Sequence, residues 1–401
     1  MSPRLQVDFV KCLGNMTLQM CIAIDTEILV LFGPSGSGKT QTLQAIAGLS
    51  VPDRGSIQLD DTTFFQRIPG KPIINLPARR RRIGYVFQQY ALFPHMSAFE
   101  NVAFPLMGRR DARDRAMELL ERMHLTHLAQ RMPHELSGGQ QQRVAIARAL
   151  ATEPRVLLFD ESFSALDRPI RERLHEEIRA LQAERQLIVI YVTHNLDDAF
   201  AVGHRLAVAR DGRIEQIGRI DDVFTRPANQ WVLNILGIPN AINARIAESG
   251  PSGALLDWNG IMLEAPPLDA PPGTQVVAYI RPEDIRLIYP NRPLRRIFGN
   301  NHLEGVVAER RLERHVYRLK VALSDGWHIE AVYPASSYTT MNLTVGERVR
   351  LALRKESIVV MTDPKGAIRS DALMHSDGRP EDDSALALQP PPSQRIRSSG
   401  A

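Results

Sequence analysis

The chain has 401 residues, enough for two or three domains. Its 44% apolar and 23% charged residues are typical of a globular protein, and its net charge of +4 is too small to indicate nucleic-acid binding. Two cysteines, Cys12 and Cys21, exclude a disulfide framework and are expected to be small core residues. No apolar run has the length of a signal peptide or a membrane span, so other chains must supply any spanning helices.

The first 32 residues alternate between short apolar runs and turn residues, which predicts β-strands. Residues 28–32 are wholly apolar, as expected of a strand buried on both faces of a sheet. A glycine-rich segment follows, and then a predicted helix at 41–49, which ends near Gly48 and Pro52. This order of strand, loop and helix is the start of a βαβ unit.

The glycine-rich segment matches the pattern of a phosphate-binding loop without a gap. It consists of Gly33, Pro34, Ser35, Gly36, Ser37, Gly38, Lys39 and Thr40. Small residues let the backbone wrap around phosphates, so that its N–H groups and the following helix N-terminus face the anion. We expect Lys39 to reach the β- and γ-phosphates of a nucleotide and Thr40 to hold Mg²⁺.

Strands and helices continue to alternate further along the chain. The predicted strands are residues 83–87, 156–159 and 187–192, and the predicted helices are residues 111–132, 144–151 and 169–185. This alternation predicts an α/β domain with a largely parallel sheet. Four consecutive arginines, Arg79 to Arg82, precede the first of these strands and are expected to form a solvated loop, because no aromatic stacking surface accompanies them.

Two acids, Asp160 and Glu161, end the predicted strand at 156–159. Buried strands do not normally end in paired carboxylates without a cation or a proton to handle. Asp160 is suited to bind Mg²⁺, directly or through water, and Glu161 to orient and deprotonate an attacking water. A solvated strand end is the alternative.

A second glycine-containing segment precedes the predicted helix at 144–151 and consists of Ser137, Gly138, Gly139 and Gln140. The two glycines leave backbone N–H groups exposed at a helix start, which predicts a second anion site. A plain N-cap role for Ser137 is the alternative. Two phosphate-binding surfaces in one chain suggest a nucleotide that is shared between two chains.

The pattern changes after about Gly237, where glycine and proline turns begin to separate short strands. This indicates an all-β region of barrel type. The predicted strands are residues 254–257, 275–280, 303–309, 316–323, 328–332, 348–353 and 357–361. Beyond about Asp363 no apolar period is left, so the tail at 364–401 is predicted to be disordered.

The order of these segments resembles the ATP-binding-cassette (ABC) ATPases. Residues 136–140 are similar to the family's signature sequence, which lies between the phosphate loop and the paired acids. By this resemblance, Gln88 is the glutamine that contacts Mg²⁺ and the lytic water, and His194 is the switch histidine at the γ-phosphate. The loop that crosses the dimer interface corresponds to Ser164, Ala165, Leu166 and Asp167.

The resemblance implies a P-loop ATPase domain at 1–236, with a helical insertion at about 89–150, and a TOBE-like barrel region at 240–363. Two subunits, as a homodimer or a pair of related ABC chains, would close head to tail on two ATP molecules. ATP and Mg²⁺ are the implied cofactors. The implied catalytic residues are Glu161, His194 and Gln88, and the implied metal ligands are Thr40, Gln88 and Asp160.

The implied partners are transmembrane permease subunits and, indirectly, a solute-binding protein, at the cytoplasmic face of the inner membrane and without nucleic acid. The family's groove for a short permease helix begins at residues 88–94. Exposed side chains at Tyr90, Leu92 and Phe93 would suit such a groove, with local core packing as the alternative.

The start Leu13-Gly14-Asn15 and the last barrel look most like the molybdate-type importers, so import of molybdate or another inorganic anion is the expected function. Sugar, polyamine and ferric-iron importers, a soluble non-transport ABC ATPase and a non-catalytic regulator are alternatives. The barrel is expected to be scaffold, with an oxyanion site as the alternative. Two residues depart from the family pattern. Ser162 replaces a proline after the acids, and Leu13 replaces an adenine-stacking aromatic, for which Phe9 is the nearest candidate.

Overall fold

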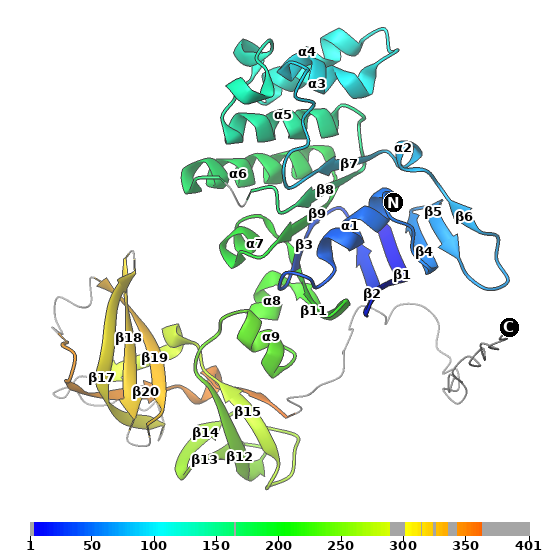
Figure 1. Cartoon of the computed structure of the whole chain (residues 1–401). Helices are drawn as coiled ribbons and strands as arrows, with labels where there is room; N and C mark the ends of the chain where they lie inside the picture. Colours follow the sequence, from blue (N-terminus) through cyan, green and yellow to red (C-terminus); the bar gives the residue numbers. More distant parts are fainter. Residues whose placement is uncertain are drawn as a thin grey trace, which may run out of the picture. The chain divides into compact units, whose positions relative to one another are not determined.

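The computed structural model describes residues 4–163, 166–288, 301–313, 315–323, 326–335 and 343–362 (Figure 1). The predicted tail at 364–401 lies outside the described residues, as do Ser164 and Ala165. The predicted fold class is confirmed, since an α/β region is followed by an all-β region. The domain limits stay predictions, although helix α9 ends at Ile235 and strand β12 begins at Ala241.

A six-stranded sheet forms the centre of the α/β region. Its order is β11-β10-β3-β9-β8-β7, and every neighbouring pair is parallel except β10 with β11. The strands are β3 (Ile28–Phe32), β7 (Ile83–Val86), β8 (Val156–Asp160), β9 (Ile188–Thr193), β10 (Arg205–Arg210) and β11 (Arg213–Arg219). Strands β3, β8 and β9 are buried along their whole length, which explains their unbroken apolar runs.

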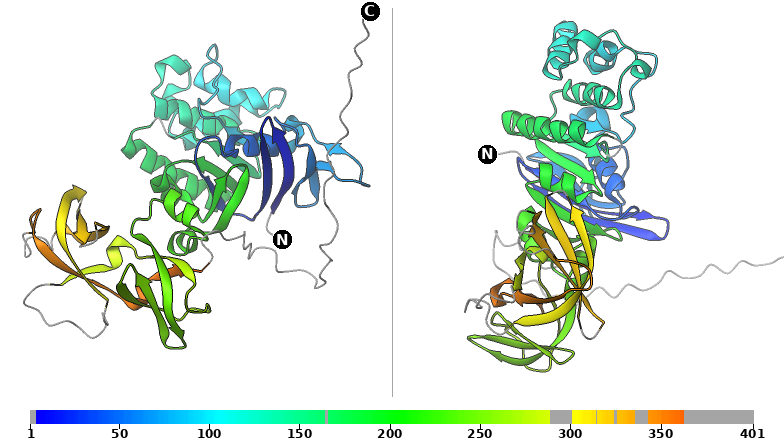
Figure 2. Two further views of the ribbon diagram at one scale, coloured as in Figure 1. Left: turned by 60° about the horizontal axis from the view of Figure 1, so that its bottom comes forward. Right: turned by 90° about the vertical axis from the view of Figure 1, so that its left-hand side faces the viewer.

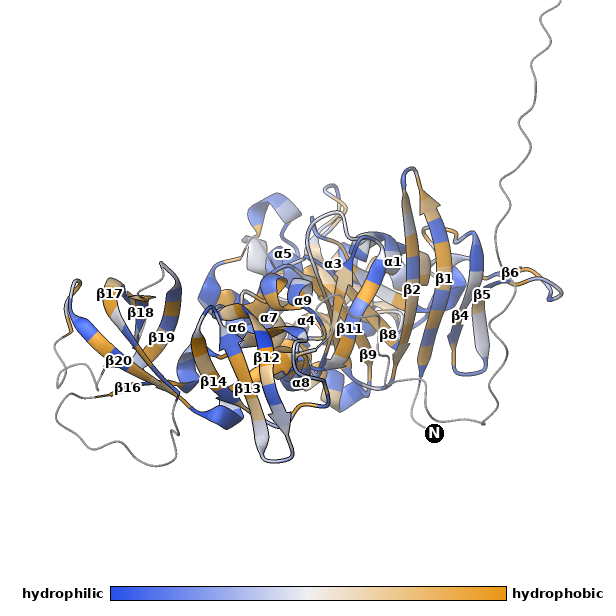
Figure 3. Cartoon of the chain, turned by 90° about the horizontal axis from the view of Figure 1, so that it is seen from below, coloured by the Kyte–Doolittle hydropathy of each residue, from blue (hydrophilic) through white to orange (hydrophobic). Residues whose placement is uncertain are grey.

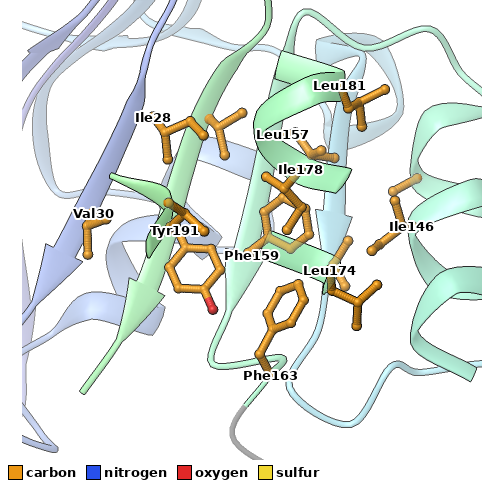
Figure 4. Close-up of a cluster of buried hydrophobic side chains, with 14 of the residues drawn as sticks. Ile28, Val30, Ile146, Leu157, Phe159, Phe163, Leu174, Ile178, Leu181 and Tyr191 are labelled. Atoms are coloured by element: carbon orange, nitrogen blue, oxygen red, sulfur yellow. The ribbon is translucent and has the colours of Figure 1, made fainter. Parts of the chain in front are cut away.

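Successive residues of these strands fill two different cores, one on each face of the sheet. Leu157 and Phe159 of β8 pack with Tyr191 of β9 against helices α5 (Gly138–Leu150) and α6 (Arg168–Arg185) (Figure 4). Val156 and Leu158 belong to the other core, to which helix α1 (Lys39–Ala47) contributes. Strand β8 therefore packs into both cores, and this packing holds its carboxyl end in place.

A second, antiparallel sheet of order β2-β1-β4-β5-β6 closes the core around α1. Its strands are β1 (Leu5–Leu13), β2 (Met16–Ile24), β4 (Arg54–Leu59), β5 (Thr62–Arg67) and β6 (Ile74–Asn75). The expectation that the cysteines are core residues is wrong, since Cys12 and Cys21 are both exposed. They occupy outward positions of β1 and β2, whose inward residues, such as Leu18 and Met20, fill the core.

Helices α3 (Ala98–Ala103), α4 (Ala112–Arg122) and α5 gather in one group beside the sheet (Figures 1 and 2). The predicted helix at 111–132 is shorter than expected. It ends at Arg122, because His124 has a left-handed backbone with φ 56° and only a separate turn, Thr126–Leu128, follows. The remaining helices are α2 (Ala78–Arg81), α7 (Leu196–Val202), α8 (Ile220–Thr225) and α9 (Gln230–Ile235).

The expectation of a loop at Arg79 to Arg82 is wrong for its first three residues, which belong to helix α2. Arg79, Arg80 and Arg82 are exposed as expected, but Arg81 is not. Its side chain is buried, and Nη1 donates to the carbonyl oxygens of Ala45 and Ile46 at 2.8 Å each. Nε donates to the Leu76 carbonyl at 2.8 Å. Arg81 thus satisfies open carbonyls at the end of α1, and burial lowers its pKa to about 10.

The all-β region consists of two five-stranded antiparallel sheets around one apolar core. The first has the order β14-β13-β12-β15-β21 and consists of β12 (Ala241–Gly250), β13 (Gly253–Trp258), β14 (Ile261–Ala265), β15 (Gln275–Tyr279) and β21 (Val359–Met361). The second has the order β16-β20-β17-β18-β19 and consists of β16 (Ile285–Ile288), β17 (His302–Glu313), β18 (Val316–Leu323), β19 (His328–Pro334) and β20 (Arg348–Leu353). Figure 3 shows polar and apolar residues alternating along these strands.

Two asparagines connect this region internally. Asn301 is buried, and its side-chain amide accepts from Glu264 N at 2.7 Å and donates to Glu264 O at 2.8 Å. Asn240 makes the same pair of bonds with the backbone of Glu330, at 2.6 and 2.7 Å. Each side chain therefore hydrogen-bonds the backbone N–H and C=O of one residue in the other sheet and links the two sheets.

Within the described ranges, no helix combines the length and the apolar character that crossing a bilayer would require.

Candidate functional site

The glycine-rich segment joins β3 to α1 at the carboxyl edge of the central sheet. Helix α1 begins at Lys39, two residues earlier than predicted, with Gly38 as its N-cap at φ 95°. A Cβ atom at Gly33 would lie 2.3 Å from the carbonyl oxygen of Ala209, so only glycine fits there. A Cβ atom at Gly36 would meet nothing within 4 Å, which leaves this side of the loop open to a ligand.

Lys39 lies inside the loop with 4% of its surface exposed. Its Nζ donates to the carbonyl oxygens of Gly33 at 2.9 Å and Pro34 at 2.8 Å, and lies 3.9 Å from Glu161 Oε1. Burial lowers the pKa of Lys39, and the carboxylates of Glu161 and Asp160 oppose that shift. A buried ammonium group beside a backbone cradle is suited to a phosphate anion.

Asp160 is the last residue of β8 and is 5% exposed. Both of its carboxylate oxygens accept hydrogen bonds, from Thr40 Oγ1 at 2.8 Å and from the Tyr85 hydroxyl at 2.9 Å. Tyr85 was not predicted as a site residue. The parallel register of β7 and β8 places it opposite Leu158, two residues before Asp160, so Tyr85 and Asp160 share one face of the sheet. Burial and the Asp160 charge raise the pKa of Tyr85, so its hydroxyl stays a donor.

Glu161 follows the strand with a left-handed backbone, φ 46°, and its N–H donates to the Val192 carbonyl at 3.1 Å. This turn brings its carboxylate to 3.3 Å from Nδ1 of His194, which follows β9. The carboxyl ends of β3, β8 and β9 are neighbours in the parallel sheet. The sheet edge therefore gathers the predicted residues Lys39, Thr40, Asp160, Glu161 and His194 at one place.

Gln88 lies two residues beyond the end of β7 and is exposed. In the described part of the chain, no hydrogen bond or ion pair joins its side chain to the other predicted site residues. The chain then turns sharply, since Tyr90 and Ala91 both have left-handed backbones, with φ 59° and 48°. Tyr90, Leu92 and Phe93 are half-buried, and Tyr90 and Leu92 pack against the core, so they are neither fully exposed nor simple core residues.

Arg148 of α5 holds this turn. Its guanidinium donates to the carbonyl oxygens of Tyr90 at 2.9 Å and Ala91 at 2.8 Å, and lies 5.3 Å from the centre of the Phe93 ring. Asn101 is fully buried and accepts from Phe93 N at 2.9 Å. The turn after Gln88 is therefore tied to α3 and α5. Arg148 was not predicted as a site residue, since nothing in the local pattern shows what an arginine in a helix contacts.

An apolar groove of about 400 Å³ lies along α3 and the start of α4. Phe104 and Met107 on its border are 41% and 75% exposed. The lining residues are Met96, Phe99, Glu100, Ala103, Phe104, Met107, Ala112 and Arg113. Exposed large apolar side chains of this kind mark surfaces that bind a partner.

The second glycine-containing segment starts α5. Ser137 is its N-cap and forms a capping box with Gln140, so the N-cap alternative describes this geometry. A Cβ atom at Gly139 would lie 2.8 Å from Ile170 Cγ2, so glycine is needed where α5 meets α6. Among the described residues, no hydrogen bond or ion pair joins residues 137–140 to residues 33–40.

The predicted dimer-interface loop is described only in part, because Ser164 and Ala165 lie outside the described residues. Leu166 is buried, and its carbonyl accepts from Arg171 Nη2 at 3.0 Å. Asp167 is exposed at the N-cap of α6. Leu166 thus fixes the loop to its own chain, while Asp167 is available to a partner.

The residues at the sheet edge fit a magnesium nucleotide. The Ser37 hydroxyl is buried inside the loop and has no hydrogen-bond partner in the described part of the chain, as expected of a group that awaits a phosphate oxygen. The Thr40 hydroxyl and Asp160 carboxylate offer oxygen ligands, which Mg²⁺ prefers, together with phosphates and water. Among the described residues, no three or more His, Cys, Asp or Glu side chains group together as a metal site.

The structure shows where the residues that depart from the family pattern, Leu13 and Ser162, are located. Phe9 is fully buried in the core, so its ring cannot stack on a base. Leu13 is only partly buried. Ser162 is buried directly after the acids, and none of the described residues bonds to its hydroxyl.

Comparisons with known proteins agree with this geometry. A family model described as "ABC transporter" matches residues 18–164, and one described as "TOBE domain" matches residues 278–361. The chain is 37% identical over 362 residues to the spermidine/putrescine import ATP-binding protein PotA of Nitrosospira multiformis, which covers 88% of this chain and 96% of that protein. It is 38% identical over 323 residues to the protein of the same name from Escherichia coli K12, with 77% and 80% covered.

Among solved structures, CbiO1 of Clostridium perfringens, part of the ABC transporter complex CbiONQ, matches with 27% identity and a TM-score of 0.50, over 56% of this chain and 92% of that one. The matches confirm the expected importer-type ATPase, its use of ATP with Mg²⁺ and its C-terminal barrel. They do not confirm the likeness to molybdate importers, because both relatives are named for spermidine and putrescine. The chain belongs to the ABC transporter family, as an importer ATP-binding subunit with a C-terminal TOBE domain.

Proposed function

We propose that this chain is the ATP-hydrolysing subunit of a polyamine importer. The observation that carries the proposal is the 37% identity along 96% of a protein named for spermidine and putrescine import. That similarity covers 88% of this chain, so it includes the barrel as well as the ATPase region. From the sequence alone, molybdate import was the expected function and polyamine import was one of the alternatives.

In this proposal, residues 33–40 bind the phosphates of ATP, with Lys39 leaving its loop carbonyls to meet the β- and γ-phosphates. Thr40 and Asp160 hold Mg²⁺, and Gln88 joins them when its exposed segment moves inward. Bound Mg²⁺ supplies positive charge at the phosphate oxygens. The 2.8 Å contact between Thr40 and Asp160 supports this assignment.

Glu161 is the group that is left to act on water, because Asp160 is already engaged by two hydroxyl groups. Its carboxylate accepts a proton from the water that attacks the γ-phosphate. His194, 3.3 Å from that carboxylate, orients it and contacts the γ-phosphate. Since Lys39 also lies 3.9 Å from Glu161, entry of a phosphate between them would separate the carboxylate from Lys39.

ABC cassettes of importers act as dimers with membrane permease subunits. Here Ser137, Gly138, Gly139 and Gln140 would meet the ATP of the partner subunit, since no contact in the described chain joins them to its own phosphate loop. A short permease helix would occupy the apolar groove on α3 and α4, beside the turn at 88–94. The subunit would then work at the cytoplasmic face of the inner membrane and serve a solute-binding protein indirectly.

Uptake by cells tests the substrate class. We expect deletion of the gene from its host to abolish uptake of labelled spermidine and to leave uptake of molybdate, ferric iron and maltose unchanged. The wild-type gene should restore spermidine uptake, and the Lys39→Ala gene should not, although its protein is present. Loss of uptake of another solute instead of spermidine would refute polyamine import and leave the ATPase assignment intact.

Mixed dimers test the shared site. Ser137→Arg damages the signature segment and Lys39→Ala damages the phosphate loop, so each purified variant alone should have no intact site. A mixed dimer should regain one of the two sites and about half of the parent activity. Full activity from a strictly monomeric parent protein would contradict a site that is shared between two chains.

A further inference from the structure

We propose that Tyr85 is a positioning residue that orients Asp160 and so sets the affinity of the nucleotide site for Mg²⁺. The proposal rests on the proposed function in one respect, the assignment of Asp160 as a metal ligand. Tyr85 does not belong to the phosphate loop, the paired acids or the signature segment. Its link to the site is the 2.9 Å hydrogen bond from its hydroxyl to Asp160 Oδ2.

The bond fixes the rotation of the Asp160 carboxylate. Oδ1 accepts from Thr40 and Oδ2 from Tyr85, so donors on opposite oxygens hold the carboxylate in one plane. Asp160 is 5% exposed, so few water molecules can replace a lost donor. Without Tyr85, the carboxylate would turn about its last side-chain bond and meet the ion in the preferred orientation less often.

Tyr85 is itself held rigidly, which makes it an effective support. Its ring stacks on Phe87 with a centroid distance of 4.2 Å and an angle of 27°, and it packs against the core around α1. Its backbone lies in β7, paired in parallel with β8, which carries Asp160. The hydroxyl therefore reaches Asp160 at little further entropic cost, because the ring is already ordered by packing.

The arrangement also places Tyr85 on the strand that leads to Gln88. The two residues are three positions apart, and β7 ends between them. One strand thus supplies the support of one proposed metal ligand, Asp160, and the residue proposed to join it, Gln88. The metal side of the site is therefore built from the edge strand β7 as well as from β8 and α1.

The test uses Tyr85→Phe, which keeps the ring, its stacking on Phe87 and its packing, and removes only the hydroxyl. Binding of a fluorescent ATP analogue to the purified full chain is measured first in EDTA and then in a Mg²⁺ titration. We expect unchanged affinity in EDTA and a roughly tenfold higher Mg²⁺ concentration for half-maximal binding, the effect of one lost hydrogen bond to a charged group. Tyr317→Phe, which removes a phenol hydroxyl in the barrel, should change neither value.

A second variant separates support of Asp160 from a general structural role. In the Asp160→Asn background, Tyr85→Phe should have little further effect on the Mg²⁺ response, because the charge that it orients is gone. The proposal is overturned if Tyr85→Phe leaves the Mg²⁺ midpoint unchanged, or if it weakens binding in EDTA by the same factor. If the parent chain bound nucleotide without any Mg²⁺ dependence, the metal assignment of Asp160 would fail instead.

Discussion

The carboxyl edge of the central sheet and the interior of the β region use buried polar side chains in opposite ways. In the β region, the side-chain amides of buried Asn301 and half-buried Asn240 bond to backbone groups, Asn301 to Glu264 and Asn240 to Glu330 and Ile280. At the sheet edge, Lys39 bonds to two carbonyl oxygens of its own loop and lies beside Glu161. These contacts can be exchanged for contacts with an anion.

The difference shows how the same chemistry serves stability in one region and function in the other. A buried amide with matched partners stabilises one arrangement of the chain. A buried charge with replaceable partners is costly to keep and is found where a ligand will take over those partners. Substitutions should therefore act differently in the two regions. At the sheet edge they should lower the rate of ATP hydrolysis strongly, and in the barrel they should lower only the free energy of unfolding.

The largest effect is expected for Glu161→Gln. The amide keeps the size of the side chain and loses its basicity, so ATP hydrolysis should fall by about 10²–10⁴-fold, the usual contribution of a general base. ATP binding should persist, and the variant should accumulate as an ATP-dependent dimer on gel filtration. Turnover at the parent rate would show that another group activates the water.

Arg148→Met should have the largest effect on stability. It removes the donors to the Tyr90 and Ala91 carbonyls and keeps an apolar stem, so the free energy of unfolding should fall by about 2–4 kcal/mol. Urea denaturation measures this change. Arg131→Met is the matched control, since it removes an exposed ion pair with Glu135 and should cost less than about 0.5 kcal/mol. Equal effects of the two variants would contradict the role of Arg148 as a support.

Asn301→Ala should destabilise the barrel by about 1–3 kcal/mol, because the backbone N–H and C=O of Glu264 lose their hydrogen bonds to the Asn301 side chain. The loss should appear in urea denaturation of a Trp231→Phe background, in which the remaining fluorescence comes from Trp258 and Trp327 of the barrel. ATP binding should not change. A change in nucleotide affinity would mean that the two regions are not as separate as their polar groups indicate.

The smallest effect is expected from substitutions at two helix caps, which can be compared directly. Ser97 and Ser137 each form a capping box, at α3 and α5, so Ser→Ala at either position should cost about 1 kcal/mol of stability. Only Ser137→Ala should also lower ATPase activity, since only Ser137 is proposed to meet a nucleotide. Equal loss of activity in both variants would show that capping alone explains Ser137.

The sequence predicted the parts of the fold that depend on local patterns. The wholly apolar runs of β3 and β8 were found because strands buried on both faces have no polar alternation to disguise them. Strand β12 was missed, since the alternation of Ile242, Ala244 and Ile246 with polar residues is short and is broken by a register shift between Ile246 and Glu248. The early end of α4 depends on the backbone of His124, a residue that also fits inside a helix.

The residues of the candidate site also fall into those that local patterns predict and those that only the fold reveals. Lys39, Asp160 and Glu161 could be identified because each belongs to a short pattern with its own chemistry. Tyr85, Arg81 and Arg148 could not, because their contacts with Asp160, Ala45 and Ala91 span 75, 36 and 57 residues and depend on how elements pack. The assignment of Gln88 stays a prediction, since its exposed side chain does not reach the other groups in the described chain.

Strand β21 has a consequence for synthesis of the chain. It pairs with β15 through Val277 and Met361, although the whole second sheet of the β region lies between them in the sequence. A ribosome that has released β12 to β15 therefore exposes an open sheet edge until the last strand emerges. During that interval the unpaired backbone groups of β15 can pair with another chain and cause aggregation. A stop codon just before residue 359 would make this state permanent.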